Sequence, residues 1–137
     1  MAVVSEEQLV FVYGTLRLGC ENASQMDEAR FVARATARGR LYACRWPAIV
    51  KGEGYVVGEL YAVNQGQLAL LDAFEDEGRL YARERCDVRD EHGQRHSAWI
   101  YRWLGSIEEC RPIPSGDVSR VLGKRTGDDS TRRAAGR

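Results

Sequence analysis

The feature that most constrains the fold is an apolar segment that runs directly into a turn bracketed by glycines. Residues 9–13 are rich in β-branched and aromatic side chains, which favour a β-strand. Gly14 and Gly19 then enclose a polar connection that carries Thr15 and Arg17. In such a turn the backbone NH groups can face an anionic ligand. A strand followed by an ordinary turn also accounts for the pattern, so the segment alone defines no site.

Composition predicts one globular domain with no strong charge. The chain has 137 residues and a hydrophobic fraction of 44%, which is ordinary for a single domain. Its 20 Lys and Arg residues balance 20 Asp and Glu residues, so no global field draws it to nucleic acid or to an anionic membrane. We also expect no membrane span, because no apolar stretch is long enough. A small molecule is the expected partner.

A change in composition near the C-terminus predicts a domain boundary. From residue 118 onward the chain is dominated by Arg, Lys, Gly, Asp, Ser and Thr, with too few large apolar side chains to offset the entropy cost of ordering. We predict a single domain over residues 1–122 and a flexible basic tail over residues 123–137. The tail either attracts polyanions weakly or only aids solubility.

The four cysteines give no sign of a zinc or redox motif. They are widely spaced and form no C-x-x-C pair, and the polar, acidic N-terminus lacks the features of a secretion signal. We therefore expect reduced thiols and a cytoplasmic location. The cysteines are Cys20, Cys44, Cys86 and Cys110.

Between the opening turn and the tail, strand-like and helix-like segments alternate without the regular spacing of a βαβ protein. Asn64 can cap a helix in which Leu68, Leu71 and Phe74 form an apolar stripe. Glycines at positions 52 and 54 predict a turn between two strands. The predicted elements are a short helix over residues 24–30, strands over 31–44 (bent at Gly39), 48–50 and 55–63, a helix over Gln65–Glu75, and hairpin strands over 83–89 and 95–103.

Mostly antiparallel strands, glycine bends and two short helices predict an α+β fold. We expect a small mixed, mostly antiparallel β-barrel with short flanking helices, because glycine bends let a sheet curl on itself. The mouth of such a barrel is a common ligand site.

Several short motifs follow one another in a fixed order between residues 10 and 117. They are Tyr13-Gly14-Thr15-Leu16-Arg17 with Gly19 and Asn22, Gly58-Glu59-Leu60-Tyr61, Leu71-Asp72-Ala73-Phe74-Glu75, Tyr81-Ala82-Arg83, Tyr101 and Ile113-Pro114-Ser115-Gly116-Asp117. Each motif is weak alone, but the ordered set resembles the γ-glutamylcyclotransferase-like family. Within that family it most resembles the γ-glutamylamine cyclotransferase branch.

The resemblance implies a cofactor-independent enzyme of the acyltransferase or amidine-lyase type. Its reaction closes a γ-glutamyl amide into 5-oxoproline and releases the amine, without metal or cofactor. Since the α-amine of the substrate attacks its own γ-carbonyl, the protein has to hold the glutamyl arm folded back on itself. It also has to take a proton from the amine and return one to the departing nitrogen.

The resemblance further implies that Glu75 is the carboxylate that moves these protons. It stands six residues before Tyr81, the family's offset for the catalytic glutamate. Without the resemblance, a solvated carboxylate at a helix end is the simpler interpretation. Many members follow the glutamate with glycine, whereas this chain has Glu75-Asp76-Glu77-Gly78. Glu77 is therefore the alternative general base.

Recognition of the substrate falls, by the same resemblance, to the opening turn and two tyrosines. Backbone groups of the turn would hold the α-carboxylate and α-amine of the glutamyl group, since glycine lets the backbone approach a ligand closely. Arg17 either adds a charge-assisted contact or points into solvent. The implied binding residues are Tyr13, Gly14, Thr15, Leu16, Arg17, Tyr81 and Tyr101.

Two other kinds of site are disfavoured. His92 and His96 are four residues apart, but a predicted hairpin does not put them on one helical face, so we expect exposed histidines and not metal ligands. A Ser or Cys nucleophile would need a histidine base beside it, and both histidines lie in that hairpin. A non-catalytic small-molecule-binding or interaction module on the same fold is the alternative function. The leaving group and the oligomeric state stay open.

Overall fold

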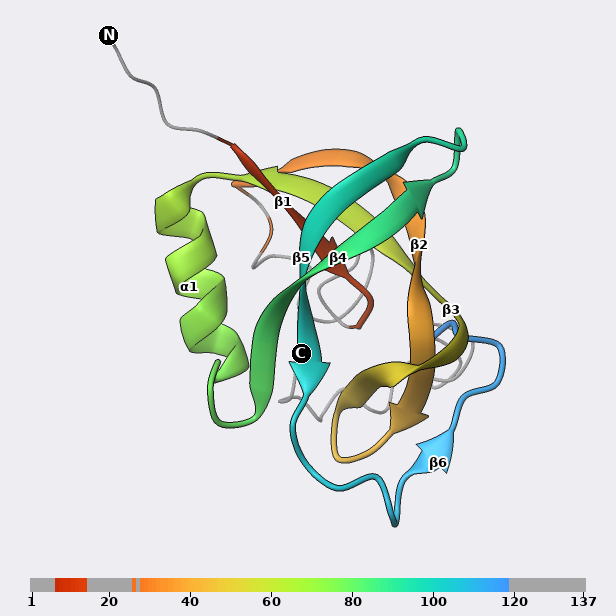
Figure 1. Cartoon of the computed structure of the whole chain (residues 1–137). Helices are drawn as coiled ribbons and strands as arrows, with labels where there is room; N and C mark the ends of the chain where they lie inside the picture. The colour runs from red at the N-terminus through yellow and green to blue at the C-terminus, as the bar shows by residue number, and fades with distance from the viewer. Residues whose placement is uncertain (1–6, 15–25, 27, 119–137) are drawn as a thin grey trace, which may run out of the picture.

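The computed structural model describes residues 7–14, 26 and 28–118, and these residues form mostly β-strands (Figure 1). In chain order the elements are β1 (Gln8–Val12), β2 (Arg30–Ala43), β3 (Pro47–Val63), α1 (Gln65–Glu75), β4 (Tyr81–Asp90), β5 (Arg95–Trp103) and β6 (Arg111–Pro112). The predicted tail over residues 123–137 lies outside the described residues. Residues 24, 25 and 27 of the predicted helix over residues 24–30 also lie outside them. The end of that prediction is wrong, because residues 28 and 29 form a turn and a bend and Arg30 already belongs to β2.

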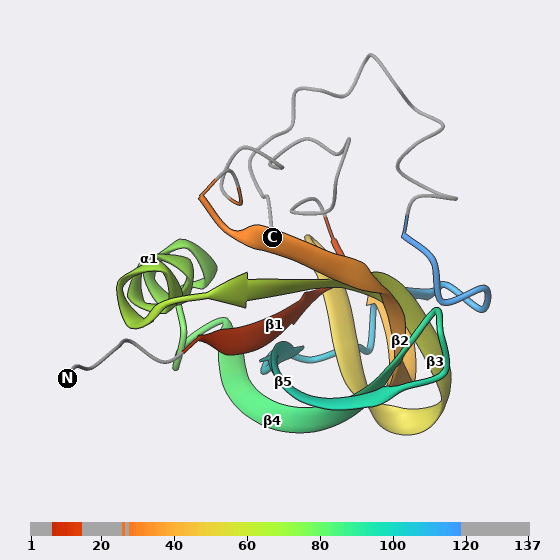
Figure 2. The ribbon, with the colours of Figure 1, turned by 90° about the horizontal axis from the view of Figure 1, so that it is seen from above.

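Five strands close into a barrel. Neighbouring strands follow the order β3-β1-β5-β4-β2, and a further pairing of β2 with β3 joins the two ends of this order. The β1–β5 pair is parallel, and the other pairs are antiparallel. The short β6 adds to β2. Seen from above, the strands form a ring with α1 to one side (Figure 2). The predicted α+β fold with a small mixed, mostly antiparallel barrel is confirmed, with one helix in the described part of the chain.

The predicted turn at residues 52–54 is wrong, because β3 runs without a break from Pro47 to Val63. In the β2–β3 register Arg38 lies opposite Tyr55 and Arg40 lies opposite Val50, so residues 51–54 bulge out against a single residue of β2. Gly54 takes a φ of +102°, which suits a glycine in such a bulge. The bulge bends both strands and helps the sheet to close on itself.

The core has two apolar layers, which lie on the two faces of β1. Successive side chains of a strand point to opposite faces. Phe11 therefore packs inside the barrel, whereas Val10 and Val12 face the layer under α1, where they meet Leu68 and Leu71. Because β1 is buried on both faces, its sequence is a continuous apolar run and shows no alternation.

Helix α1 begins and ends as its sequence directs. The Asn64 side chain accepts a hydrogen bond from the Gln67 backbone NH at 2.8 Å, and the Gln67 side-chain oxygen accepts one from the Asn64 backbone NH at 2.7 Å. This capping box satisfies two NH groups of the first turn and confirms the predicted cap. At the other end Asp76 adopts a left-handed conformation with φ of 56° and stops the helix. The structure describes no helix long and apolar enough to cross a membrane.

Strands β4 and β5 form the predicted hairpin, whose turn is at the upper right of Figure 1. Asp90 organises this turn, since its Oδ1 atom accepts hydrogen bonds from the backbone NH groups of His92 and Gln94 at 2.8 and 2.9 Å. The expectation of two exposed histidines is wrong for His96. Its side chain is half-buried, and its Nε2 atom lies 2.8 Å from Oδ2 of Asp90.

The expectation of reduced thiols is also wrong for one pair of cysteines. Cys44, just after β2, forms a disulfide with Cys110, just before β6, with the two Cα atoms 4.5 Å apart. This pairing could not be predicted from the sequence, because the two cysteines are 66 residues apart and are brought together by the β2–β6 pairing. Cys86 is a free, half-buried thiol whose pKa burial raises to about 11. Cys20 lies outside the described residues.

Candidate active site

One small pocket gathers most of the residues that the sequence nominated. It lies where β1, α1 and β5 end and where β4 begins, and its volume is about 10 Å³, enough for one water molecule. The nominated residues Thr15, Leu16 and Arg17 lie outside the described part of the chain. The lining residues are Phe11, Val12, Tyr13, Gly14, Glu75, Tyr81 and Tyr101.

Glu75 is a buried carboxylic acid at the last position of α1. Only 3% of its surface is exposed. It follows Leu68 by seven residues and Leu71 by four, so it continues the buried stripe of the helix at a position where an apolar side chain is expected. Carboxylates are rarely buried so fully unless they are bonded to a partner or have a function. The helix period therefore turns this acid into the pocket.

The two acidic residues that follow Glu75 face elsewhere. Asp76 forms an ion pair with Arg79 at 2.7 Å on the surface. Glu77 is exposed, does not line the pocket, and accepts a hydrogen bond from the backbone NH of Arg83 at 3.2 Å. Of the two candidate general bases, Glu75 is the one that the fold brings to the pocket.

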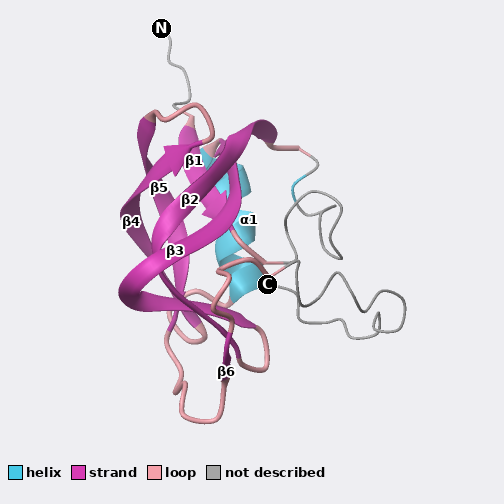
Figure 3. Ribbon diagram, turned by 90° about the vertical axis from the view of Figure 1, so that its right-hand side faces the viewer, coloured by secondary structure: helices cyan, strands magenta, loops and turns pink. Residues whose placement is uncertain are grey.

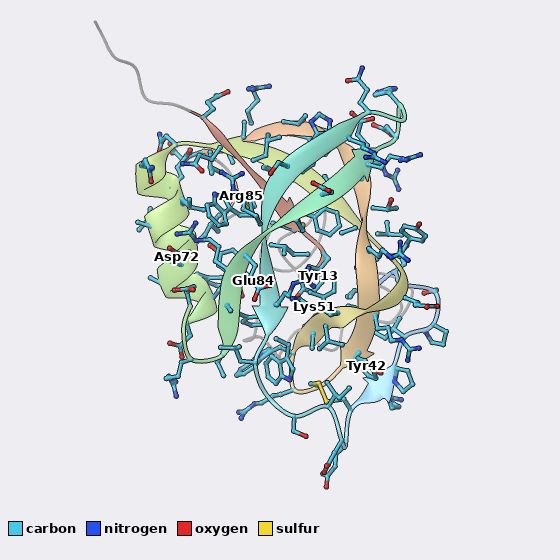
Figure 4. The ribbon with its side chains drawn as sticks, viewed as in Figure 1. Tyr13, Tyr42, Lys51, Asp72, Glu84 and Arg85 are labelled. Atoms are coloured by element: carbon cyan, nitrogen blue, oxygen red, sulfur yellow. A yellow bond between two sulfur atoms is a disulfide. The ribbon has the colours of Figure 1, made fainter. Side chains whose placement is uncertain are left out.

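Tyr13, labelled near the middle of Figure 4, packs in the same core cluster as Phe11. Two hydrogen bonds hold its hydroxyl. Its hydroxyl donates to the carbonyl oxygen of Tyr101 at 2.7 Å and accepts from the NH of Ile49 at 3.3 Å. Burial, followed by the negative charge of Glu75, raises the pKa of Tyr13 above its ordinary value. Tyr13 therefore keeps its proton and fixes the end of β1 just before Gly14.

Tyr81 and Tyr101 line the pocket but direct their hydroxyls into the scaffold. The Tyr81 hydroxyl donates to the carbonyl oxygen of Pro47 at 2.6 Å. The Tyr101 hydroxyl donates to Oδ1 of Asp72 at 2.7 Å, and that oxygen also accepts from Nε of Arg83 at 2.7 Å. Burial and the bond to Asp72 raise the pKa of Tyr101. Both tyrosines thus serve the pocket wall and the core together.

Sequence reasoning gave no role to Asp72 or to Glu59, although both stand in the quoted motifs. Asp72, on α1 in Figure 4, joins the helix to β4 and β5 through the two bonds just described. Glu59 lies opposite Val12 in the β1–β3 register, is 7% exposed, and accepts a hydrogen bond from the Tyr61 hydroxyl at 3.0 Å. The sequence feature that could have singled out Glu59 is the one that singles out Glu75. Each is a carboxylate at a position where the pattern of its strand or helix predicts an apolar residue.

The structure thus combines a closed barrel with a buried acid, Glu75, that shares a pocket with Gly14. Residues 10–120 match the family described as gamma-glutamyl cyclotransferase, AIG2-like. The chain therefore belongs to this family, as the motifs predicted.

Individual relatives give the same result. The gamma-glutamylcyclotransferase family protein YtfP of Escherichia coli K12 is 34% identical over 110 residues, which cover 79% of this chain and 93% of YtfP. The gamma-L-glutamyl-butirosin B gamma-glutamyl cyclotransferase of Niallia circulans is 35% identical over 101 residues, 67% of this chain and 64% of that protein.

Solved structures share the fold. An uncharacterized protein from Pyrococcus horikoshii superimposes with a TM-score of 0.70 at 28% identity, over 86% of this chain and 95% of that one. A mouse AIG2-like protein superimposes with a TM-score of 0.69 at 28% identity, over 75% of this chain and 81% of that one. Family and relatives together support γ-glutamyl cyclotransferase activity in general terms.

Proposed function

We propose that this protein converts a γ-glutamyl amide or γ-glutamyl amine into 5-oxoproline and releases the amine, with Glu75 as general base and then general acid. The observation that carries the proposal is the burial of Glu75 in a pocket that also contains Tyr13 and Gly14. Membership of the γ-glutamyl cyclotransferase family supplies the reaction class.

The reaction makes one carbon–nitrogen bond and breaks another. The substrate's α-amine nitrogen attacks the γ-carbonyl carbon and loses a proton to the Glu75 carboxylate. As the tetrahedral intermediate collapses, the original amide bond breaks and Glu75 returns the proton to the departing nitrogen. Nucleophile and electrophile belong to one molecule, so holding the glutamyl arm folded lowers the activation barrier. In the best model reactions this effect is about 7 kcal/mol or more. No cofactor is needed for either step.

The position of Glu75 suits an acid that both takes and gives a proton. Burial disfavours the charged form of a carboxylic acid. The C-terminal end of a helix carries partial negative charge, and the last turn of α1 contains no basic residue to offset it. General acid–base catalysis near neutral pH requires a group whose protonated and ionised forms are close in free energy, and burial at a helix C-terminus is a setting that favours this in a carboxylic acid.

Recognition of the glutamyl group is assigned to the turn that begins at Gly14. Because glycine has no Cβ atom, a ligand can approach the backbone there. Thr15, Leu16 and Arg17 stay predicted binding residues, as the resemblance implied. The pocket has to widen to admit a γ-glutamyl group, since its present volume of about 10 Å³ holds no more than a water molecule.

The test is to incubate the purified protein with γ-glutamyl amines and γ-glutamyl amino acids and to measure 5-oxoproline. Glu75→Gln is expected to lower kcat by about a hundredfold or more, the usual contribution of a positioned general base. Glu77→Gln is the matched control. Glu77 carries the same charge, lies two residues after Glu75 and is exposed. Loss of turnover in Glu77→Gln but not in Glu75→Gln would assign the base to Glu77. Binding of panel members without turnover by any of them would favour a non-catalytic binding module.

A further inference from the structure

A second hollow lies on the outer wall of the barrel, away from the Glu75 pocket. Its volume is about 570 Å³, within the range of about 300–1,000 Å³ that is typical of small-molecule sites. Its lining residues come from β2, β3, β4 and β5, the strands that cross in front of α1 in Figure 3. The hollow and the Glu75 pocket share no lining residue. The lining residues of the hollow are Thr36, Arg38, Tyr55, Asp87, Val88, Arg89 and Arg95.

The charge of this hollow is unusual for an ordinary sheet surface. Arg89 lies directly opposite Arg95 in the β4–β5 ladder. Like charges in directly opposed positions destabilise a sheet. Within the described residues, neither of these arginines nor Arg38 has a carboxylate at ion-pair distance. Four other described arginines form ion pairs, in the bridges Arg30–Glu7, Arg79–Asp76, Arg83–Asp72 and Arg102–Glu84. The direct opposition of Arg89 and Arg95, more than the lack of an ion pair, therefore distinguishes the hollow.

An aromatic ring lies beside these cations. Tyr55 on β3 is 62% exposed, which is high for a large aromatic side chain, and it lies opposite Arg38 on β2. The guanidinium carbon of Arg38 is 5.9 Å from the centre of the Tyr55 ring. Asp87 adds one hydrogen-bond acceptor to the same hollow. The surface thus combines a flat apolar face, several guanidinium groups and one carboxylate.

We propose that this hollow binds a small organic phosphate of the nucleotide type. The phosphate accepts hydrogen bonds from Arg89 and Arg95, because the planar guanidinium matches phosphate geometry and keeps its charge. The base stacks on Tyr55, and a sugar hydroxyl donates to Asp87. A nucleotide supplies all three chemistries, and its charge would relieve the repulsion between the opposed arginines. A long polyanion is disfavoured, since the chain has no net charge to attract one.

The experiment is a calorimetric titration of the full chain with ADP, pyrophosphate and adenosine. ADP is expected to bind more tightly than adenosine, and added salt is expected to weaken the binding of ADP and of pyrophosphate. The double variant Arg89→Gln/Arg95→Gln should weaken ADP binding by about tenfold or more, because charge-assisted hydrogen bonds are lost. Tyr55→Leu should weaken the binding of ADP but leave the binding of pyrophosphate unchanged. Arg111→Gln on β6 is the matched control, since it removes an exposed arginine outside the hollow.

The double variant should also melt at the same temperature as the wild-type protein or at a higher one, because it removes the like-charge opposition. Its cyclotransferase turnover should be unchanged, which separates this proposal from the one for Glu75. Three results would overturn the proposal. The first is that neither ADP nor pyrophosphate binds at about millimolar concentration. The second is that Arg111→Gln weakens ADP binding as much as the double variant does. The third is that a single-stranded oligonucleotide binds but ADP does not.

Discussion

Reduction of the Cys44–Cys110 disulfide is expected to lower the free energy of unfolding by about 4 kcal/mol. The bond closes a loop of 66 residues. In the chain-entropy description, a loop of that length removes about 15 cal/mol/K from the unfolded state, which gives about 4 kcal/mol near room temperature. With a urea m-value of about 2 kcal/mol/M for a domain of this size, the unfolding midpoint falls by about 2 M.

The assay is urea unfolding followed by tryptophan fluorescence, with and without a phosphine reductant. The double variant Cys44→Ala/Cys110→Ala should unfold at the midpoint of the reduced wild-type protein and should not respond to the reductant. Cys86→Ala is the control, because this thiol is free in the structure. If the oxidised protein, the reduced protein and the double variant all unfold at one urea concentration, the loop-entropy reasoning is refuted.

The same bond also supports the wall of the Glu75 pocket. Cys44 begins a short turn in which its NH donates to the carbonyl oxygen of Trp46 at 3.1 Å. The next residue, Pro47, accepts the hydroxyl of Tyr81. The rings of Trp46 and Tyr81 both contact the ring of Trp103, with centroids 6.4 and 5.4 Å apart. Reduction should therefore raise KM for the γ-glutamyl substrate even under conditions where the protein stays folded.

Three further outcomes are expected. The hydrogen bond from His96, followed by the backbone NH groups of the hairpin turn, lowers the pKa of Asp90 from 3.8 to about 2. Its stabilising effect is therefore present above pH 3.8 and lost as the pH falls to about 2, so the difference in urea midpoint between wild type and Asp90→Asn should vanish across that window. Because the pKa of Cys86 is raised to about 11, native Cys86 should be alkylated by iodoacetamide at pH 8 far more slowly than in urea, as measured by peptide mass spectrometry. Glu75→Gln should leave the melting temperature within a few degrees of wild type while lowering kcat by about a hundredfold or more, because glutamine keeps the shape of the side chain; a much lower melting temperature would assign Glu75 a structural role.

Elements with local signals could be predicted from the sequence. Asn64 and the leucine stripe defined α1 because a cap and a helical period are properties of neighbouring residues. The hairpin turn was equally local. The continuity of β3 was not, because Gly52 and Gly54 have the same local chemistry in a turn and in a bulge. Only the pairing with β2 decides between the two.

The candidate site divides in the same way. Glu75 could be proposed from the family resemblance, and its helical position explains its burial. The partners of the pocket tyrosines could not be predicted, since the Pro47 carbonyl and Asp72 come from segments 34 and 29 residues away in the sequence. The Cys44–Cys110 bond was hidden for the same reason. Contacts between distant segments depend on strand order, which no local pattern encodes.

The topology itself explains why Glu75 and Gly14 meet. Strand β3 is antiparallel to β1, and its last residue Val63 lies opposite Gln8, the first residue of β1. Helix α1 therefore starts beside the beginning of β1 and packs along its outer face. Eleven helical residues extend about 16 Å, and the five residues of β1 extend about 17 Å. The helix and the strand consequently end at the same level, so Glu75 at the end of α1 and Gly14 just after β1 line the same pocket.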